Sequence, residues 1–180
     1  VGGPRFSPYA YQAHIHDMLP GDGASYCENI RRWAGPDTYL LGEINAGNHS
    51  IGLSNSFTEA NRLDAVYTID FTKRGFTAAV IADVLSGLER IGDIAMWLSS
   101  HDQARHLSAM GDGSADEARF LALACASLPG PWMIYQGEEL GLPQPELSQE
   151  DTRDPFDLAF WPDGPGREGA RVPLPWKSRH

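Results

Sequence analysis

Residues 93–102 have the sequence DIAMWLSSHD, a short and almost continuous apolar run that ends in polar side chains. Three other segments have the same form, at residues 38–44, 64–71 and 131–136. Nearly continuous apolar content is typical of strands that are covered on both faces, as in parallel sheets. We therefore interpret the four runs as buried strands.

Amphipathic helices are predicted between these runs. Ser25 and Glu28 have the spacing of a capping box, which predicts that a helix begins at Ser25. Ser114 and Glu117 repeat the pattern and predict a second helix, which ends before Pro129. Apolar residues recur at steps of three or four over residues 76–91, which predicts a third helix.

The alternation of strands and helices indicates βαβ units and a parallel sheet. The runs end near residues 43, 71, 99 and 136, and this regular spacing suits a (β/α)8 barrel as well as a doubly wound sheet. No glycine-rich phosphate-binding motif follows any run, which weakens the doubly wound alternative. Four strands are half of the eight that close a barrel, so we expect either an open sheet or a partial TIM barrel.

The composition excludes several classes of function. The formal net charge of −10 disfavours binding to phosphate backbones and anionic membranes, so we expect no nucleic-acid or membrane partner. Cys27 and Cys125 are too few for a disulfide framework and are expected to be buried apolar side chains. His14 and His16 lack a third ligand nearby, so no metal or other cofactor is expected. No signal peptide is recognisable, and a cytoplasmic location is expected.

A proline-rich segment follows Gly141. Seven of the 13 prolines lie between residues 143 and 175, which predicts neither strands nor helices there. The segment also carries Phe and Trp side chains, so we expect an ordered loop on the surface rather than a linker. The predicted division is a barrel part at residues 1–141 and a substrate-side loop at residues 142–180.

Carboxylates and a histidine stand at the predicted C-terminal ends of the strands, where parallel α/β folds bind ligands. Glu43 lies in the first run, His101 and Asp102 follow the third, and Glu138 and Glu139 follow the fourth. Two carboxylates at one edge suit cleavage of a glycosidic bond, in which one donates a proton and another stays charged. We expect Glu43 to be buried in that role. The alternative is that Glu43 and Asp102 cap loops or pair with arginines. For Glu138 and Glu139 we favour a structural role, in which they connect this edge by hydrogen bonds, over ligand binding.

Three stretches of the sequence resemble motifs of the α-amylase family (glycoside hydrolase family 13). LLGEI at residues 40–44 resembles its strand-five motif, WLSSHD at residues 97–102 its strand-seven motif, and residues 129–141 its strand-eight segment. The resemblance implies that Glu43 is the general acid/base and that Asp102 stabilises the transition state. It also implies that His101 contacts the sugar.

The proline-rich segment resembles a smaller group of enzymes within this family. GREGARVPLPW at residues 166–176 is similar to a loop of exo-acting α-glucosidases and oligo-1,6-glucosidases, whose second arginine, here Arg171, contacts the substrate. Residues 8–12 resemble the stretch after strand four of the same enzymes. Ser100 and Val172 replace an asparagine and a threonine that are usual in the family.

The family's nucleophilic aspartate closes strand four, and no matching motif occurs in this sequence. The resemblance therefore implies about strands five to eight of a (β/α)8 TIM barrel, with the long Pro-rich loop after the last strand. The N-terminal half of the barrel, with the nucleophile, and a C-terminal domain are expected to lie outside this chain. The 180-residue chain is then inactive by itself.

The implied function is a retaining α-glucoside hydrolase that acts on oligosaccharides or small α-glucosides, with or without transglycosylation. One alternative is an enzyme of the sucrose isomerase or trehalose synthase type, and residues 45–48 after the acid do not decide between them. Another alternative is a non-catalytic barrel relative. We consider it the weaker one, because such relatives lose the acid and stabiliser positions that Glu43 and Asp102 occupy here.

Overall fold

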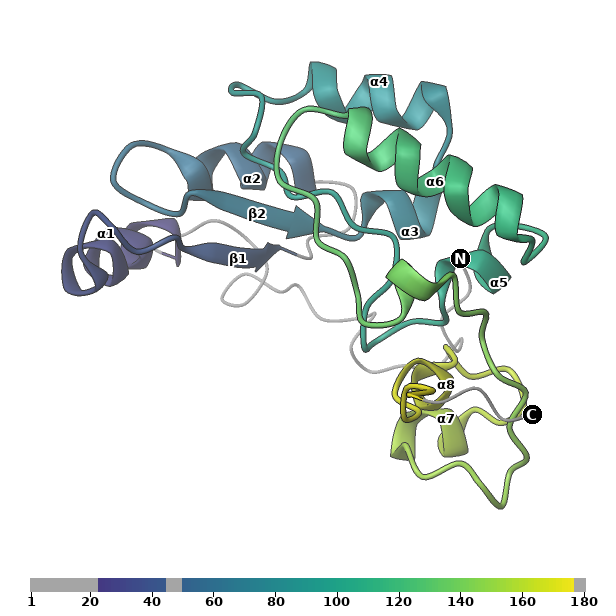
Figure 1. Cartoon of the computed structure of the whole chain (residues 1–180). Helices are drawn as coiled ribbons and strands as arrows, with labels where there is room; N and C mark the ends of the chain where they lie inside the picture. The colour runs from purple at the N-terminus through teal and green to yellow at the C-terminus, as the bar shows by residue number, and fades with distance from the viewer. Residues whose placement is uncertain (1–22, 45–49, 177–180) are drawn as a thin grey trace. The chain divides into compact units, whose positions relative to one another are not determined.

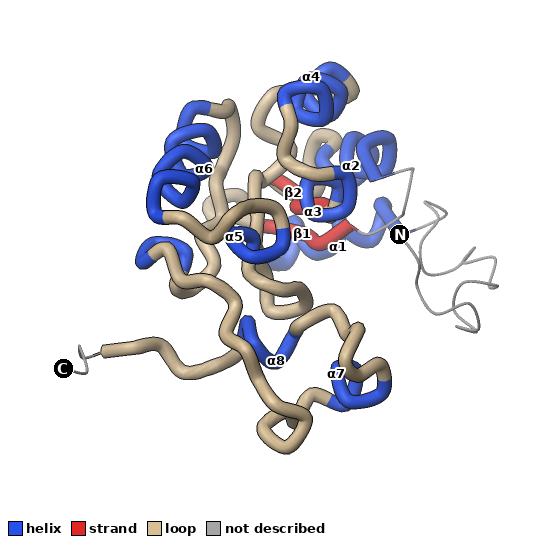
Figure 2. Tube along the Cα trace, turned by 90° about the vertical axis from the view of Figure 1, so that its right-hand side faces the viewer, coloured by secondary structure: helices blue, strands red, loops and turns tan. Residues whose placement is uncertain are grey.

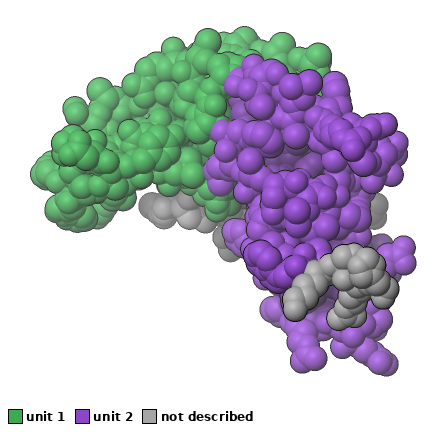
Figure 3. All heavy atoms as spheres, viewed as in Figure 1, with its two compact units in different colours: residues 1–95, 129–131 green, residues 96–128, 132–180 purple. Residues whose placement is uncertain are grey.

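The structure is a computed structural model that describes residues 23–44 and 50–176 (Figure 1). The described residues form two compact units (Figure 3). The first contains residues 23–44, 50–95 and 129–131, and the second contains residues 96–128 and 132–176. Each unit has its own buried residues and is treated by itself below.

The first unit is built on two parallel strands, drawn in red in Figure 2. Strand β1 (Leu41–Ile44) pairs with β2 (Ala65–Thr68), and Glu43 stands opposite Tyr67 in the register. An isolated parallel bridge joins Val66 to Ile94, and both side chains are buried. The parallel arrangement predicted for the first three apolar runs is therefore confirmed within this unit.

Four helices accompany this sheet: α1 (Gly23–Ala34), α2 (Ser50–Thr58), α3 (Asp70–Arg74) and α4 (Ala78–Ser86). Because α1 already includes Gly23, the prediction that this helix begins at Ser25 is wrong. The start of α4 follows the capping rule, since the Thr77 side chain accepts a hydrogen bond from the Val80 amide.

Helix α4 is shorter than predicted. It ends at Ser86, and Ile91, the last residue of the predicted apolar stripe, is 70% exposed. Gly87 ends the helix at a close contact, because a Cβ atom there would lie 2.7 Å from Cγ2 of Ile51. The helical period in the sequence continues beyond the helix itself.

An ion pair connects α1 to the residue directly before β2. The Arg31 guanidinium pairs with Asp64, and the Leu40 amide donates to the same carboxylate oxygen over 2.6 Å. Burial raises the pKa of Asp64, but the Leu40 amide and the Arg31 charge outweigh it and lower the pKa below its ordinary value. The ionised Asp64 side chain therefore fixes Leu40, the residue directly before β1.

The second unit contains helices α5 (His106–Ala109) and α6 (Ala115–Ser127) and the short 3-10 helix η3 (Glu138–Leu140). Met96 and Trp132 form an isolated parallel bridge, and the Met133 amide donates to the Met96 carbonyl over 2.8 Å. The third and fourth apolar runs therefore lie parallel here, although neither forms a longer strand in the described residues.

Helix α6 confirms its sequence prediction. The Ser114 side chain accepts a hydrogen bond from the Glu117 amide over 3.1 Å, and Leu121 and Cys125 are buried. The Glu117 side chain accepts from the Asp112 amide rather than from that of Ser114, so only one half of the predicted capping box forms.

Much of the chain after α6 is loop, shown in tan in Figure 2, but it contains two more helices. These are α7 (Pro155–Ala159) and α8 (Arg167–Ala170), so the prediction that no helix occurs in the Pro-rich segment is wrong. Pro155 starts α7 because a proline in the first helical turn gives up no hydrogen bond. The predicted boundary at residue 141 stays a prediction.

The two cysteines are buried and free, as expected from the sequence. Burial and the nearby charge of Glu138 raise the pKa of the Cys125 thiol to about 12. Among the helices of the described residues, none combines the length and the apolar character needed to cross a membrane.

The cap of α6 gives a first test. Replacing Ser114 by alanine removes the acceptor for the Glu117 amide and should lower the free energy of unfolding by about 1 kcal/mol, measured by denaturant titration of the protein at its natural length. Ser86→Ala is the control, because Ser86 is exposed and only donates to a carbonyl within α4. We expect it to change stability by less than about 0.5 kcal/mol. Equal losses in the two variants would contradict the capping role.

Candidate active site

Two arginines gather two aspartates in the second unit. Nη2 of Arg171 and Nη2 of Arg167 each lie 2.9 Å from Oδ1 of Asp102. Nη1 of Arg171 lies 2.8 Å from Oδ2 of Asp154, and Nε of Arg167 lies 3.5 Å from the same oxygen. We call these four residues the arginine–aspartate cluster.

The local sequence explains why both arginines face the same carboxylates. Arg167 opens α8 and Arg171 follows its last residue, so the two lie about one helical turn apart. Asp157 of α7 fixes the start of α8 by accepting hydrogen bonds from the Gly166 and Glu168 amides over 3.1 and 2.7 Å. In return, the Glu168 side chain accepts from the Arg153 amide over 2.7 Å. The two short helices therefore hold each other.

Asp154 has a structural and an electrostatic role. Its Oδ1 accepts hydrogen bonds from the amides of Phe156 and Asp157 at the start of α7, and its side chain is only 4% exposed. Burial raises the pKa of Asp154, but these amides and the charges of Arg167 and Arg171 outweigh it and hold the pKa below its ordinary value. Asp154 is thus a fixed negative charge behind the arginines.

Asp102 is the accessible carboxylate of the cluster, with 45% of its side chain exposed. It follows the buried residues Met96–Ser99, which anchor the start of its loop. Nε of Arg171 donates to the His101 carbonyl over 2.8 Å, and Nε2 of His101 lies 3.6 Å from Oδ2 of Asp102. The structure therefore brings together three of the four residues that the sequence analysis selected: His101, Asp102 and Arg171.

The sequence-based predictions include neither Arg167 nor Asp154, the two other members of the cluster. The one-turn spacing of Arg167 and Arg171 was a usable signal, as was an aspartate directly before the proline that starts α7. Nothing local in the sequence indicates that Asp154 and Asp102 share the same arginines.

Glu43, the fourth selected residue, lies in the first unit on β1. The Tyr67 hydroxyl, opposite it on β2, donates to Oε2 of Glu43 over 2.6 Å. The expectation that Glu43 is buried is wrong for the described residues, because β1 pairs only with β2 there and its outer edge is open. That Glu43 and Asp102 act on one substrate stays a prediction.

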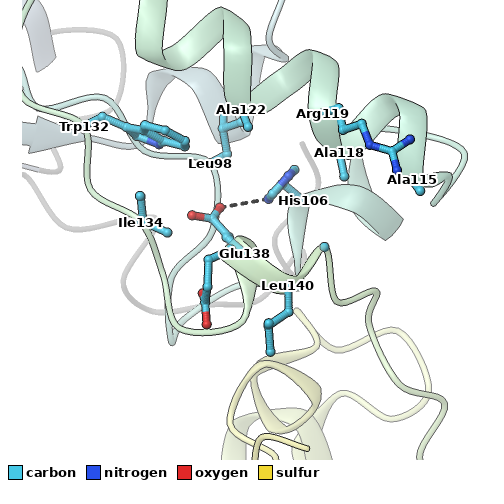
Figure 4. A pocket seen from close by; sticks show the side chains of 12 residues that line it. Leu98, His106, Ala115, Ala118, Arg119, Ala122, Trp132, Ile134, Glu138 and Leu140 are labelled. Atoms are coloured by element: carbon cyan, nitrogen blue, oxygen red, sulfur yellow. Dashed lines mark ion pairs between the residues drawn. The ribbon is translucent and has the colours of Figure 1, made fainter. Parts of the chain in front are cut away.

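The second unit also has a cavity of about 380 Å³, most of whose lining side chains are apolar (Figure 4). Arg119, Glu138 and Glu139 also line it, and Oε1 of Glu138 lies 2.9 Å from Nδ1 of His106, as the dashed line shows. Oε2 of Glu138 accepts from the Tyr135 amide over 2.7 Å, and Glu139 accepts from the Gly137 amide over 2.8 Å. These contacts support the structural role that the sequence analysis favoured for Glu138 and Glu139.

In the part of the chain that the structure describes, no group of three or more His, Cys, Asp or Glu side chains is arranged to hold a metal ion. His14 and His16 lie outside the described residues, as do residues 8–12 and 45–48.

The sequence of the chain is similar to that of known proteins. The family model Alpha-amylase, described as the catalytic domain of alpha amylase, matches residues 14–180. A probable alpha-glucosidase of Rhizobium meliloti (strain 1021) is 34% identical over 185 residues, which cover 97% of this chain and 34% of that protein. An oligo-1,6-glucosidase of Parageobacillus thermoglucosidasius is 31% identical over 110 residues, which cover 49% of this chain and 20% of that protein.

Among solved structures, the alpha-glucosyl transfer enzyme XgtA superposes with a TM-score of 0.80 at 30% identity. The superposition covers 97% of this chain and 34% of that enzyme. The chain thus spans about a third of the length of the first relatives that it matches.

The charge of Asp154 gives a test that depends on pH. Because the folded-state pKa is lowered, the stability that the charge contributes is present above about pH 4, the usual pKa of an unfolded aspartate. It is lost as the pH falls through the folded-state value. Asp154→Asn keeps a cap acceptor but removes the charge, and should lower the free energy of unfolding by about 2 kcal/mol at pH 7. The difference should therefore be largest at pH 7 and should shrink as the pH falls below about pH 4.

Asp116→Asn is the matched control, because Asp116 is 93% exposed and pairs only with the exposed Arg119 in the described structure. It should change stability by less than about 1 kcal/mol at every pH. Denaturant titrations of both variants across this pH range make the measurement. A deficit for Asp154→Asn that is the same at pH 2 and pH 7 would contradict the assigned charge.

Proposed function

Because the chain belongs to the α-amylase family of catalytic domains, we propose that it supplies part of the active site of a retaining enzyme that hydrolyses short α-glucosides. The observation that carries the proposal is the arginine–aspartate cluster. It places Asp102, His101 and Arg171 within contact of one another, although about 70 residues separate Arg171 from the other two. Relatives named as an alpha-glucosidase and an oligo-1,6-glucosidase support the choice of substrate class.

In this proposal Asp102 and Arg171 bind the sugar ring that is cleaved. An exposed carboxylate accepts hydrogen bonds from sugar hydroxyls, and a guanidinium donates several in a fixed plane. Two positive charges beside Asp102 keep its carboxylate in one orientation. The negative charge of Asp102 then stabilises the oxocarbenium-like transition state.

Glu43 is the proposed general acid and base. Its carboxyl group donates a proton to the glycosidic oxygen while the bond from that oxygen to C1 breaks and a carboxylate nucleophile bonds to C1. The ionised Glu43 then removes a proton from water, whose oxygen attacks C1 and releases the nucleophile. The hydrogen bond from Tyr67 holds the Glu43 carboxyl in place. We assign the nucleophile to a polypeptide segment outside this chain, since no motif here matches it.

We further propose that the four apolar runs are about strands five to eight of a (β/α)8 barrel. The parallel pairing of β1 with β2, of Val66 with Ile94, and of Met96 with Trp132 supports this order. Barrel enzymes place their active sites at the C-terminal ends of such strands.

Transfer of glucose to an acceptor other than water is a second candidate function. The likeness to an alpha-glucosyl transfer enzyme at 30% identity favours it, and the same two steps serve both outcomes. Hydrolysis and transfer differ only in whether water or a sugar hydroxyl gives up its proton to Glu43 in the second step. Product analysis with maltose or sucrose as substrate separates hydrolysis, transfer and isomerisation.

Site variants of the protein at its natural length test the proposal, with p-nitrophenyl α-glucoside as substrate. Glu43→Gln removes the transferable proton, and Asp102→Asn removes the negative charge. Each should lower kcat/KM by roughly 10³-fold. Asp116→Asn, which changes an exposed carboxylate on α6, should leave kcat/KM within about twofold. Hydrolysis that Glu43→Gln does not affect would contradict the proposal.

The 180-residue chain by itself provides the matched experiment for the nucleophile. It should show no turnover, because the covalent intermediate requires a second carboxylate that we place elsewhere. Turnover by the purified chain that disappears in Glu43→Gln would show that the nucleophile lies within these residues.

A further inference from the structure

One buried positive charge in the second unit is not explained by the proposed chemistry. The side chain of Arg105 is 1% exposed, and Arg105 is the largest fully buried residue of the described structure. Its Nη1 donates to the Gln136 carbonyl over 2.8 Å and its Nη2 to the Ala170 carbonyl over 3.3 Å. The guanidinium also lies over the Tyr135 ring, 5.5 Å from its centre. Burial of a charge is costly, so these contacts indicate a specific task.

The partners of Arg105 connect the segments that form the arginine–aspartate cluster. Arg105 lies three residues after Asp102, and Ala170 directly precedes Arg171. A second hydrogen bond holds the same carbonyl, because the Tyr135 hydroxyl donates to the Ala170 oxygen over 3.0 Å. The loop that carries Asp102 and the end of α8 that leads to Arg171 are therefore attached to one buried guanidinium.

Hydrogen bonds also fix the other end of α8, the end at which the helix begins. The side-chain oxygen of Gln144 accepts from the Arg105 amide over 2.9 Å, and the side-chain nitrogen of Gln144 donates to the Gly166 carbonyl over 2.7 Å. The Ala104 amide donates to the Pro165 carbonyl over 2.9 Å. Both ends of the four-residue helix are thus bonded to residues 104 and 105.

Two glycines leave room for these contacts of Arg105 and Gln144. A Cβ atom at Gly137 would lie 2.7 Å from Nη1 of Arg105, and Gly137 also has φ +93°, which disfavours other residues. A Cβ atom at Gly169 would lie 2.1 Å from the side-chain nitrogen of Gln144. Backbone, arginine and glutamine can approach this closely only because side chains are missing at these two places.

We propose that Arg105 is a positioning residue: it fixes α8 against the loop after Asp102, so that Arg171 and Arg167 hold Asp102 in the orientation that binds the sugar. The inference rests on the proposed function for its link to catalysis, whereas the positioning itself concerns only the fold. Arg105 touches no substrate in this account and acts through Arg171.

Amide hydrogen exchange on the protein at its natural length tests the positioning directly. Arg105→Lys keeps the charge but loses the fork that reaches two carbonyls, and should speed exchange in residues 167–171 by about 10-fold without speeding exchange in α6. Tyr135→Phe keeps the ring and loses only its hydrogen bond to Ala170, so it should speed the same amides by a few fold. Arg119→Lys, at an exposed arginine on α6, is the control and should change neither segment.

Kinetics with p-nitrophenyl α-glucoside test the link to catalysis. Arg105→Lys should raise KM by about 10-fold. It should add little to the loss caused by Arg171→Lys, because the two residues act on the same contact. A residue that only stabilises the fold would instead lower kcat/KM by a factor that multiplies with that of Arg171→Lys.

The outcomes separate this inference from the proposed function. Faster exchange confined to residues 167–171 supports the positioning, and exchange that is unchanged or equally faster in α6 overturns it. If the unaltered protein hydrolyses no α-glucoside, the proposed function fails while the exchange result still decides the positioning. If Arg105→Lys does not fold, Tyr135→Phe decides both measurements.

Discussion

Arg171 connects two aspartates of opposite character, and the candidate site depends on this contact. Asp154 is buried and caps α7, whereas Asp102 is nearly half exposed and lies after the third apolar run. A buried carboxylate is stable only when hydrogen bonds and opposite charges offset its lost hydration, and Asp154 has two amides and two guanidiniums for this. The same guanidiniums then have donors left for Asp102. The ion pair of Arg171 with Asp154 thus fixes the position of its ion pair with Asp102.

This arrangement explains why the Pro-rich segment is ordered. Its two helices are too short to be stable by themselves, since a single turn gains few hydrogen bonds for the entropy it loses. They are held by side chains instead: Asp154 and Asp157 bind amides at the starts of α7 and α8, and Arg105 binds the carbonyl before Arg171. Order in this segment is therefore linked to order in the loop that carries Asp102.

The sequence allowed prediction of those features that depend on neighbouring residues. The apolar runs, their parallel pairing and the start of α6 follow from periodicity and from the Ser114 cap. The end of α4 did not follow, because the apolar period continues to Ile91 whereas the helix ends at Ser86, before Gly87. Helix α7 did not follow from proline content, because Pro155 occupies the first turn of the helix, which accepts proline. Helix α8 has only four residues, too few for a periodic pattern.

The candidate site shows the same difference between features set by neighbouring residues and features set by distant contacts. His101, Asp102 and Arg171 could be selected from motifs, and their proximity is seen in the structure. Arg105 could not, because its importance comes from a partner 65 residues away that no local pattern reveals. The position of Asp154 before Pro155 indicates a helix cap, but its pairing with Arg171, 17 residues away, does not follow from that position. Glu43 was expected to be buried in its role as the acid, yet it is exposed in the described residues, where β1 pairs only with β2.

A crystal structure of the protein at its natural length with a bound inhibitor that mimics an α-glucoside is the most direct measurement. The account predicts that Asp102 and Arg171 contact the sugar ring. It also places a carboxyl oxygen of Glu43 about 3 Å from the atom that replaces the glycosidic oxygen. An inhibitor bound at Asp102 with Glu43 more than about 10 Å from that atom would contradict it, because no proton could then pass between them.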